Sequence, residues 1–301
     1  MNQQFLTELK AVTAENRIFT DEPMKKHTTF RVGGPADILV QPKGTELASV
    51  IRLCRKYDVP YQVIGNGSNL LVGDRGIRGL VIEMLSKEDE ICVEDDCITV
   101  GAGMLLSKTA NRAAEHGLTG MEFAAGIPGS IGGAVVMNAG AYSGEMKDIL
   151  TAVTVLDQEG NEKILSAEEL ELGYRTSCIL KKGYIVTGAK IKLKHGEETA
   201  IRARMEELKK QRVEKQPLEY PSAGSTFKRP EGYFAAKLIE DAGLKGCARG
   251  GAQVSEKHAG FVVNKGDATA KDVCELTDYI KSEVMEKFGV GLELEVVKVG
   301  F

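Results

Sequence analysis

Two glycine-rich stretches decide the fold: residues 64–71 read IGNGSNLL, and residues 126–142 read GIPGSIGGAVVMNAGAY. The first follows YQVI at 61–64 and runs into LLV at 70–72, and both flanks have the composition of strands. A loop between two strands lacks the helix that receives the phosphates in a G-x-G-x-x-G site. The sequence also contains no G-x-x-x-x-G-K-[ST], so we predict neither a Rossmann site nor a P-loop.

The loop at 65–69 can nevertheless hold an anion through its backbone. Glycine adopts positive φ without strain, so consecutive N–H groups can point into one concavity with no side chain in the way. Pyrophosphate is the group that suits such a concavity. Taken alone, the loop fits a tight structural turn as well, and that alternative stays open.

The second stretch lies in a segment, 123–144, that carries no charged side chain and six glycines. Its glycines and proline predict a buried loop system and not a bilayer span. Such a segment either packs closely against other parts of the chain or holds a planar aromatic cofactor through backbone hydrogen bonds. The two stretches together favour a ligand that carries both a pyrophosphate and a flat ring.

Composition excludes several classes of protein. The 301 residues are 43% hydrophobic and 27% charged, which is typical of a globular chain. The net charge of −4 predicts no nucleic-acid partner and no membrane insertion. The six cysteines form no C-x-x-C pair and the four histidines have no metal-ligand spacing, so we expect no metal site. The first 16 residues do not resemble a signal peptide, which predicts a cytoplasmic protein.

Hydrophobic periodicity predicts mixed α and β structure up to residue 195. We expect two short strands around a Gly-Gly-Pro turn within 28–42, and helices near 47–54 and 105–115. Further strands are expected at 79–83, 97–100, 152–156 and 184–191.

The last third of the chain has a different pattern. A densely charged stretch at 197–215 predicts a solvated helix that leaves the first domain. Helices are then expected near 233–242 and 270–288, and strands at 261–264 and 292–299.

At this point the chain resembles a known family over nearly its whole length. The motifs are TTFRVGGPAD, IGNGSNLL, GIPGSIGGAVVMNAGAY, YRTS, GSTFKRP, HAGFVVN and LELEV, in the order found in UDP-N-acetylenolpyruvoylglucosamine reductases, the MurB flavoenzymes of peptidoglycan precursor synthesis. The resemblance implies an α+β fold, with an FAD-binding domain of the vanillyl-alcohol-oxidase (PCMH) type in two subdomains at 1–195 and a smaller substrate-binding domain at 196–301.

The resemblance also implies the reaction and its small-molecule partners. NADPH would reduce FAD, and FAD would reduce the enolpyruvyl ether of UDP-N-acetylglucosamine to UDP-N-acetylmuramate. Some flavoproteins of the wider superfamily attach FAD through His or Cys, and neither glycine stretch contains one, so we expect non-covalent FAD. No feature of the sequence indicates an oligomeric state.

Three catalytic residues follow from the family pattern. Arg175 would clamp the substrate carboxylate through two parallel hydrogen bonds, Ser225 would donate a proton to carbon, and Glu295 would orient the intermediate or share its proton. Each also has a plain structural interpretation as a surface arginine, a turn serine or an exposed strand carboxylate. Glu293 lies on the same predicted strand face as Glu295, so only the family register separates the two.

The remaining site residues are expected from the same motifs. Those for FAD are Gly65, Asn66, Gly67, Ser68, Asn69, Leu70, Gly126, Ile127, Pro128, Gly129, Ser130, Gly132, Gly133, Asn138 and Gly140. Those for the sugar nucleotide are Tyr174, Arg212, Lys215, Lys228 and Asn264. For Arg212 and Lys215, a solvated helix face is the alternative.

The chain departs from the family pattern in two places. Many relatives have Lys-Asn-Pro where this chain has Lys228-Arg229-Pro230, and the tyrosine-bearing loop of the longer family form is missing. Two other functions stay open at this stage: a sugar-nucleotide or phosphate-binding module with no redox role, and a flavin oxidase of the same superfamily.

Overall fold

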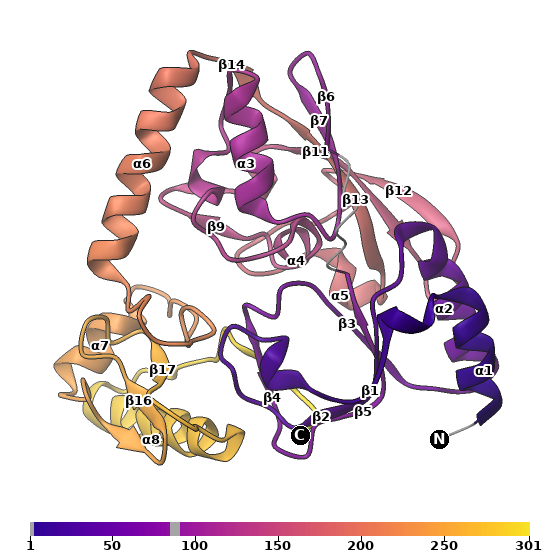
Figure 1. The fold of residues 1–301 in the computed structure, drawn as a ribbon. Helices are drawn as coiled ribbons and strands as arrows, with labels where there is room; N and C mark the ends of the chain where they lie inside the picture. Colours follow the sequence, from indigo (N-terminus) through magenta and orange to yellow (C-terminus); the bar gives the residue numbers. More distant parts are fainter. Residues whose placement is uncertain (1–2, 85–90) are drawn as a thin grey trace. The chain divides into compact units, whose positions relative to one another are not determined.

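The chain folds into two compact units in a computed structural model that describes residues 3–84 and 91–301 (Figure 1). The first unit combines residues 1–19, 38–66 and 79–212, and the second combines 20–37, 67–78 and 213–301. The expected domain boundary between residues 195 and 196 stays a prediction.

Residues 3–83 include two helices that pack over a mainly N-terminal sheet. The helices α1 and α2 lie side by side (Figure 1), and Leu9, Ile51 and Leu80 are among the fully buried side chains of this core. The sheet has the strand order β1-β2-β5-β3, and β3 pairs in parallel with β5. The bounds are α1 Gln3–Val12, β1 Ile18–Pro23, β2 Pro35–Val40, α2 Gly44–Lys56, β3 Tyr61–Ile64 and β5 Ile77–Glu83.

The first unit contains a five-stranded antiparallel sheet with the order β12-β11-β13-β7-β6. Val153 of the central strands is fully buried, as are Leu106 and Ile131 of the helices α3 and α4 that pack on this core. The bounds are β6 Ile91–Glu94, β7 Cys97–Gly101, α3 Leu106–Glu115, α4 Ile131–Val136, β11 Leu150–Leu156, β12 Glu162–Ser166 and β13 Ile185–Lys192.

The helix α4 corrects the expectation of a continuous loop system at 123–144. Ser130 begins this helix, because its side chain accepts a hydrogen bond from the Gly133 N–H at 3.4 Å. The helix is short and apolar, and its residues Ile131 and Val135 are fully buried. The sequence pattern did not predict this helix because it contains two adjacent glycines, and glycine is a poor helix former.

The second unit surrounds a core that includes Ile239, Leu276 and Val254. The helix α8 packs on the sheet β15-β16-β17 (Figure 1). A separate parallel pair joins β4 to β18, with Leu70 opposite Val297. The bounds are β4 Leu70–Val72, α7 Ala235–Asp241, β15 Ala248–Arg249, β16 Ala252–Val254, β17 Val262–Asn264, α8 Ala270–Phe288 and β18 Val297–Val299.

The charged stretch forms α6, Glu198–Lys215, as predicted, with only Ile201 and Leu208 buried along it. The remaining short elements are η1 Glu15–Arg17, η2 Met24–Lys26, β8 Leu118–Thr119, η3 Glu122–Ala124, β9 Gly140–Ala141, β10 Gly144–Glu145, η4 Met146–Asp148, α5 Cys178–Lys182 and β14 Lys194–His195.

Two strand predictions are wrong in extent. Residues 28–34 form no strand, because Arg31 and Gly33 have φ of 55° and 130° and interrupt any ladder. The terminal strand is assigned only from Val297, although an isolated bridge joins Phe227 to Leu294 before it.

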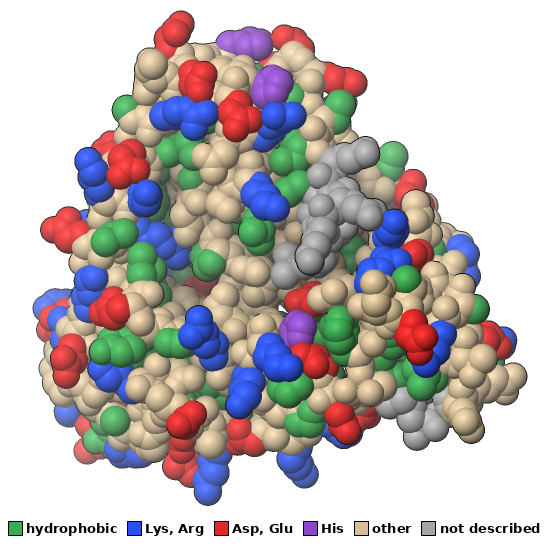
Figure 2. Space-filling view, viewed as in Figure 1, with side chains coloured by type: hydrophobic (Ala, Val, Ile, Leu, Met, Phe, Trp, Pro, Cys, Tyr) green, Lys and Arg blue, Asp and Glu red, His purple; other side chains and the backbone are tan. Residues whose placement is uncertain are grey.

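The described residues form no helix that is both long and apolar enough to cross a bilayer. On the face drawn in Figure 2, Lys and Arg side chains are interspersed with Asp and Glu. Mixed signs of this kind produce no extended basic field on that face.

The helix α8 has an unusually complete N-terminal cap. The Thr269 hydroxyl accepts from the Asp272 N–H at 3.0 Å, and the Asp272 carboxylate accepts from the Thr269 N–H at 2.9 Å. The next two N–H groups, of Ala270 and Lys271, donate to the Asp74 carboxylate at 2.7 and 3.0 Å. The hydrogen bond from the Thr269 N–H is the main cause that lowers the pKa of Asp272.

We expect Thr269→Ala to lower the free energy of unfolding by about 1 kcal/mol, because an N-cap oxygen is lost. Urea unfolding followed by circular dichroism measures this change. Thr269→Ser keeps the oxygen and is the control, with stability close to that of the unsubstituted protein. Equal losses in the two variants would contradict the capping role.

Candidate functional site

The two glycine-rich stretches meet within the first unit. A Cβ atom on Gly65 would lie only 2.1 Å from Ser130 Oγ, so no larger residue fits there without a shift. Beside it, the Asn66 side-chain amide donates to the Pro128 carbonyl at 2.7 Å. Segments more than sixty positions apart in the sequence therefore form one backbone-lined junction.

Backbone hydrogen bonds hold the second stretch at this junction. The Ile131 N–H donates to the Met104 carbonyl, and the Gly132 N–H donates to the Ala102 carbonyl, both at 2.8 Å. A Cβ on Gly132 would lie 3.0 Å from the Ala102 Cβ, closer than ordinary packing. The contact between Gly132 and Ala102 therefore requires small residues. This close packing can exist beside a bound ligand.

The rest of the first loop belongs to the second unit. Gly67 has φ of 58°, and a Cβ there would lie 2.0 Å from the His27 carbonyl oxygen. The Asn69 side chain donates to the Glu295 carbonyl at 3.0 Å, and the Val297 N–H donates to the Asn69 carbonyl at 2.9 Å. The loop predicted for FAD and the segment of the predicted catalytic Glu295 are thus joined directly.

Arg175 projects from a tight turn of the first unit. Gly173 and Thr176 exchange backbone hydrogen bonds at 3.1 and 3.3 Å, and Arg175 between them has φ of 54°. Its guanidinium donates to the Gly140 carbonyl at 3.4 Å and lies 5.2 Å from the centre of the Tyr174 ring. Arg175 is half-buried.

Ser225 and Glu295 are brought together in the second unit. The Glu295 N–H donates at 2.9 Å to the carbonyl of Thr226, the residue after Ser225. Gly224 has φ of 76°, and a Cβ there would meet nothing within 4 Å, so the serine follows a turn that opens to space. The Ser225 side chain is exposed, and Glu295 is half-buried.

The structure distinguishes Glu293 from Glu295. Glu293 is 78% exposed and forms an ion pair with Lys228 at 3.2 Å. Glu295 is less exposed and lies on the segment that Asn69 fixes. Of the two carboxylates, Glu295 is therefore the better placed for a role beside Ser225.

The predicted substrate-binding cations differ in their surroundings. Arg212 lies against the second glycine stretch, since a Cβ on Gly126 would be 3.2 Å from its Cδ atom. In the described part of the chain, Arg212 has no hydrogen bond or ion pair, and burial lowers the pKa of its guanidinium. Lys215, by contrast, is exposed.

Two predicted contact residues use their side chains inside the protein. The Asn264 amide donates to the Phe30 carbonyl at 3.3 Å, and its oxygen accepts from the Gly266 N–H at 3.0 Å. Asn138 is fully buried. The side-chain amides of both residues are therefore already used in contacts within the protein.

A residue that sequence reasoning missed shapes the segment next to Ser225. His258 Nδ1 accepts from the Gly260 N–H at 3.1 Å, and the Gly260 carbonyl accepts from the Thr226 N–H at 2.9 Å. Burial lowers the pKa of His258, so the ring is held neutral and able to accept. The HAGF sequence alone gave no signal of this arrangement.

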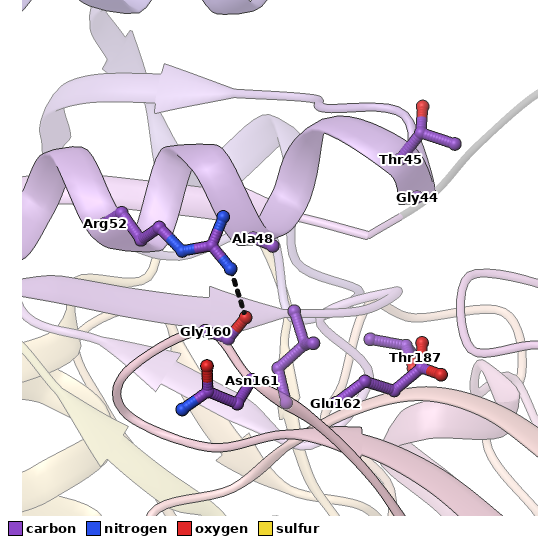
Figure 3. Close-up of a pocket in the computed structure, with 9 residues that line it drawn as sticks. Gly44, Thr45, Ala48, Arg52, Gly160, Asn161, Glu162 and Thr187 are labelled. Carbon is purple, nitrogen blue, oxygen red and sulfur yellow. Dashed lines mark hydrogen bonds between the residues drawn. The ribbon is translucent and has the colours of Figure 1, made fainter.

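A separate pocket of about 420 Å³ opens in the first unit (Figure 3). The first turn of α2 and the turn between β11 and β12 line it, and Arg52 donates to the Gly160 carbonyl at 3.0 Å across it. None of the residues predicted for cofactor or substrate lines this pocket.

Comparison with known proteins gives two family models that match the chain. Residues 36–166 match an FAD binding domain, and residues 216–299 match the C-terminal domain of UDP-N-acetylenolpyruvoylglucosamine reductase.

Whole proteins of the same name are similar over the full length. The chain is 54% identical over 312 residues to the UDP-N-acetylenolpyruvoylglucosamine reductase of Agathobacter rectalis and 53% identical over 303 residues to that of Clostridium botulinum, covering 100% of this chain and 99% of each relative. The crystal structure of the Thermus caldophilus reductase (MurB) superposes with a TM-score of 0.79 at 41% identity, covering 94% of this chain and 98% of that one.

These matches confirm the predicted family, the α+β fold with an FAD-binding domain of the vanillyl-alcohol-oxidase type followed by a substrate domain, and FAD as cofactor. Because the relatives are reductases, the alternative function of a binding module without a redox role is excluded. The chain therefore belongs to the UDP-N-acetylenolpyruvoylglucosamine reductase family and is an FAD-binding oxidoreductase.

Proposed function

We propose that this protein uses NADPH and non-covalently bound FAD to reduce the enolpyruvyl ether of UDP-N-acetylglucosamine to UDP-N-acetylmuramate, with Ser225 as the proton donor. The observation that carries the proposal is the junction of Gly65 and Asn66 with Pro128 and Ser130. Both small-molecule partners suit a cytoplasmic reaction in peptidoglycan precursor synthesis.

The residues at the junction fit FAD. The segment 126–133 presents backbone groups and apolar side chains without a charge, as a flat neutral ring requires. The glycines at 65 and 67, whose Cβ positions are occupied by Ser130 and the His27 carbonyl, let the loop backbone adopt the tight conformation that a pyrophosphate site would use. When bound, FAD would accept a hydride from NADPH and deliver it to the terminal alkene carbon of the substrate.

The protein must then stabilise and protonate an anion. Hydride addition leaves negative charge on the second carbon, which is delocalised into the carboxylate. Arg175 would hold this carboxylate through its guanidinium fork, which is preorganised by its turn. The exposed Ser225 hydroxyl would give its proton to the carbanion, a stronger base than an alkoxide, and Glu295 would orient the intermediate or share that proton.

The proposed cation contacts complete the binding of the sugar nucleotide. Arg212, Lys215 and Lys228 would meet the diphosphate, together with Tyr174 and Asn264. Arg212 supports this assignment because it is half-buried and has no acidic partner among the described residues. A partly desolvated cation without a counterion is stabilised when an anionic ligand binds.

Gly65→Ala should weaken FAD binding by about tenfold or more, because overpacking against Ser130 costs typically about 1–3 kcal/mol. The FAD content after gel filtration, read from the flavin absorbance, measures this. The matched control is Gly44→Ala, where a Cβ would meet nothing within 4 Å. Full FAD retention in Gly65→Ala would remove the junction from the cofactor site.

Ser225→Ala should keep FAD and its reduction by NADPH but slow reoxidation by the enolpyruvyl sugar nucleotide by about 10²-fold. Stopped-flow absorbance separates the two half-reactions. Ser282→Ala removes an exposed hydroxyl from α8 and serves as the control. Undiminished reoxidation by the sugar nucleotide would rule out the serine as proton donor, and rapid reoxidation by oxygen alone would favour the flavin oxidase.

Arg175→Lys should lower turnover by about 10²-fold although the charge is kept, because an ammonium group cannot make the two-pronged contact. Steady-state kinetics with the enolpyruvyl substrate measures the loss. Arg202→Lys on the exposed face of α6 is the control. Near-native turnover in Arg175→Lys would show that no bidentate contact is needed.

A further inference from the structure

Arg175 adopts a backbone conformation that arginine disfavours. Its φ of 54° is in the left-handed region, where a side chain with a Cβ is strained. Such a conformation persists only where the surrounding structure enforces it. The question is therefore which groups hold the turn of residues 173–176.

Asn138 holds the first end of this turn. Its side chain is fully buried, and its amide nitrogen donates to the Gly173 carbonyl at 3.0 Å and to the Glu145 carboxylate at 2.6 Å. Its amide oxygen accepts from the Lys147 N–H at 2.9 Å. The two donated bonds depend on an amide, since a carboxylate at this position could not donate.

Ser177 holds the other end. Its hydroxyl donates to the Val136 carbonyl at 2.6 Å and accepts from the Ile179 N–H at 3.3 Å. Both ends of the arginine turn are therefore fastened to the same short segment, residues 136–138. Ser177 is also fully buried, so water does not compete for these bonds.

The same segment leads into the hairpin that the arginine contacts. Tyr142 and Ser143 form its left-handed turn, with φ of 52° and 67°. A Cβ on Gly140 would lie 2.6 Å from the Gly144 carbonyl oxygen, so the hairpin is tightly closed. Its Gly140 carbonyl accepts the hydrogen bond from Arg175.

We propose that Asn138 is a positioning residue that fixes Arg175 for the carboxylate of the substrate, by tying the Gly173 carbonyl to the Glu145 carboxylate. This inference rests on the proposed function of Arg175. It assigns the Asn138 side chain to orienting a protein group.

Asn138→Asp tests this proposal. Asp has the same shape and tolerates positive φ, but it places a carboxylate against Glu145 and the Gly173 carbonyl. We expect reoxidation of the flavin by the enolpyruvyl substrate to slow by about tenfold or more, because small misplacements of a catalytic group are costly. Reduction by NADPH and FAD content should stay within about twofold of the unsubstituted protein.

A double-mutant cycle separates positioning from general damage. In an Arg175→Ala background, Asn138→Asp should cause no further loss in reoxidation, since the group that it positions is gone. Losses that multiply, or equal losses in both half-reactions, would overturn the proposal. If Asn138→Asp does not fold, Ser177→Ala loosens the other end of the turn and should give the same selective pattern.

The cycle also distinguishes this inference from the proposed function. If Arg175→Ala itself leaves reoxidation by the enolpyruvyl substrate unchanged, the role proposed for Arg175 fails and the positioning proposal fails with it. If Arg175→Ala slows that step while Asn138→Asp does not, only the positioning proposal is overturned.

Discussion

The close approach of Gly65 to Ser130 is the constraint on which the cofactor half of this protein depends. Because a Cβ at Gly65 would lie 2.1 Å from Ser130 Oγ, any larger residue at position 65 would force Ser130 to shift. The same serine caps α4 through the Gly133 N–H, so the loop after β3 and the start of α4 are fixed together. A neutral, backbone-lined surface results from this packing requirement. Structural packing and ligand binding, which the sequence presented as alternatives, thus favour the same small residues.

Ser225 and Arg175, the reactive groups proposed for the substrate, share one structural feature. Each side chain projects from a backbone segment that buried hydrogen bonds fix in place. Ser225 follows Gly224, whose φ of 76° opens the turn, and Thr226 behind it is buried and accepts the Val262 N–H at 2.9 Å. Arg175 stands on a turn fastened by Asn138 and Ser177. In both cases buried hydrogen bonds fix the backbone that carries the functional group. Preorganisation of this kind lowers the reorganisation that charge development would otherwise demand.

The sequence predicted the elements whose signals are local. The helix α8 shows apolar residues at helical spacing and a glycine at its end, and it was predicted at its observed bounds. Features that depend on distant partners were not predictable. Asp74 caps α8 from nearly two hundred residues away, and α4 is stabilised by burial in spite of its glycines. Residues 28–34 were misassigned because β-branched and aromatic residues favour strands, whereas Arg31 and Gly33 take positive φ.

Arg212 shows how burial changes the meaning of a charge. Arg212 and Lys215 lie on a densely charged helix, where their spacing is as typical of a solvated face as of an anion-binding site. The slightly negative net charge of the chain does not distinguish these two interpretations. Arg212 packs against Gly126 and is half-buried, and the partial desolvation of its guanidinium lowers its pKa. No acidic side chain of the described residues compensates this cation. Removing an ion from water is costly unless an opposite charge is near. An anionic ligand would supply that charge, which favours ligand binding over the solvated-face alternative for Arg212 but not for the exposed Lys215.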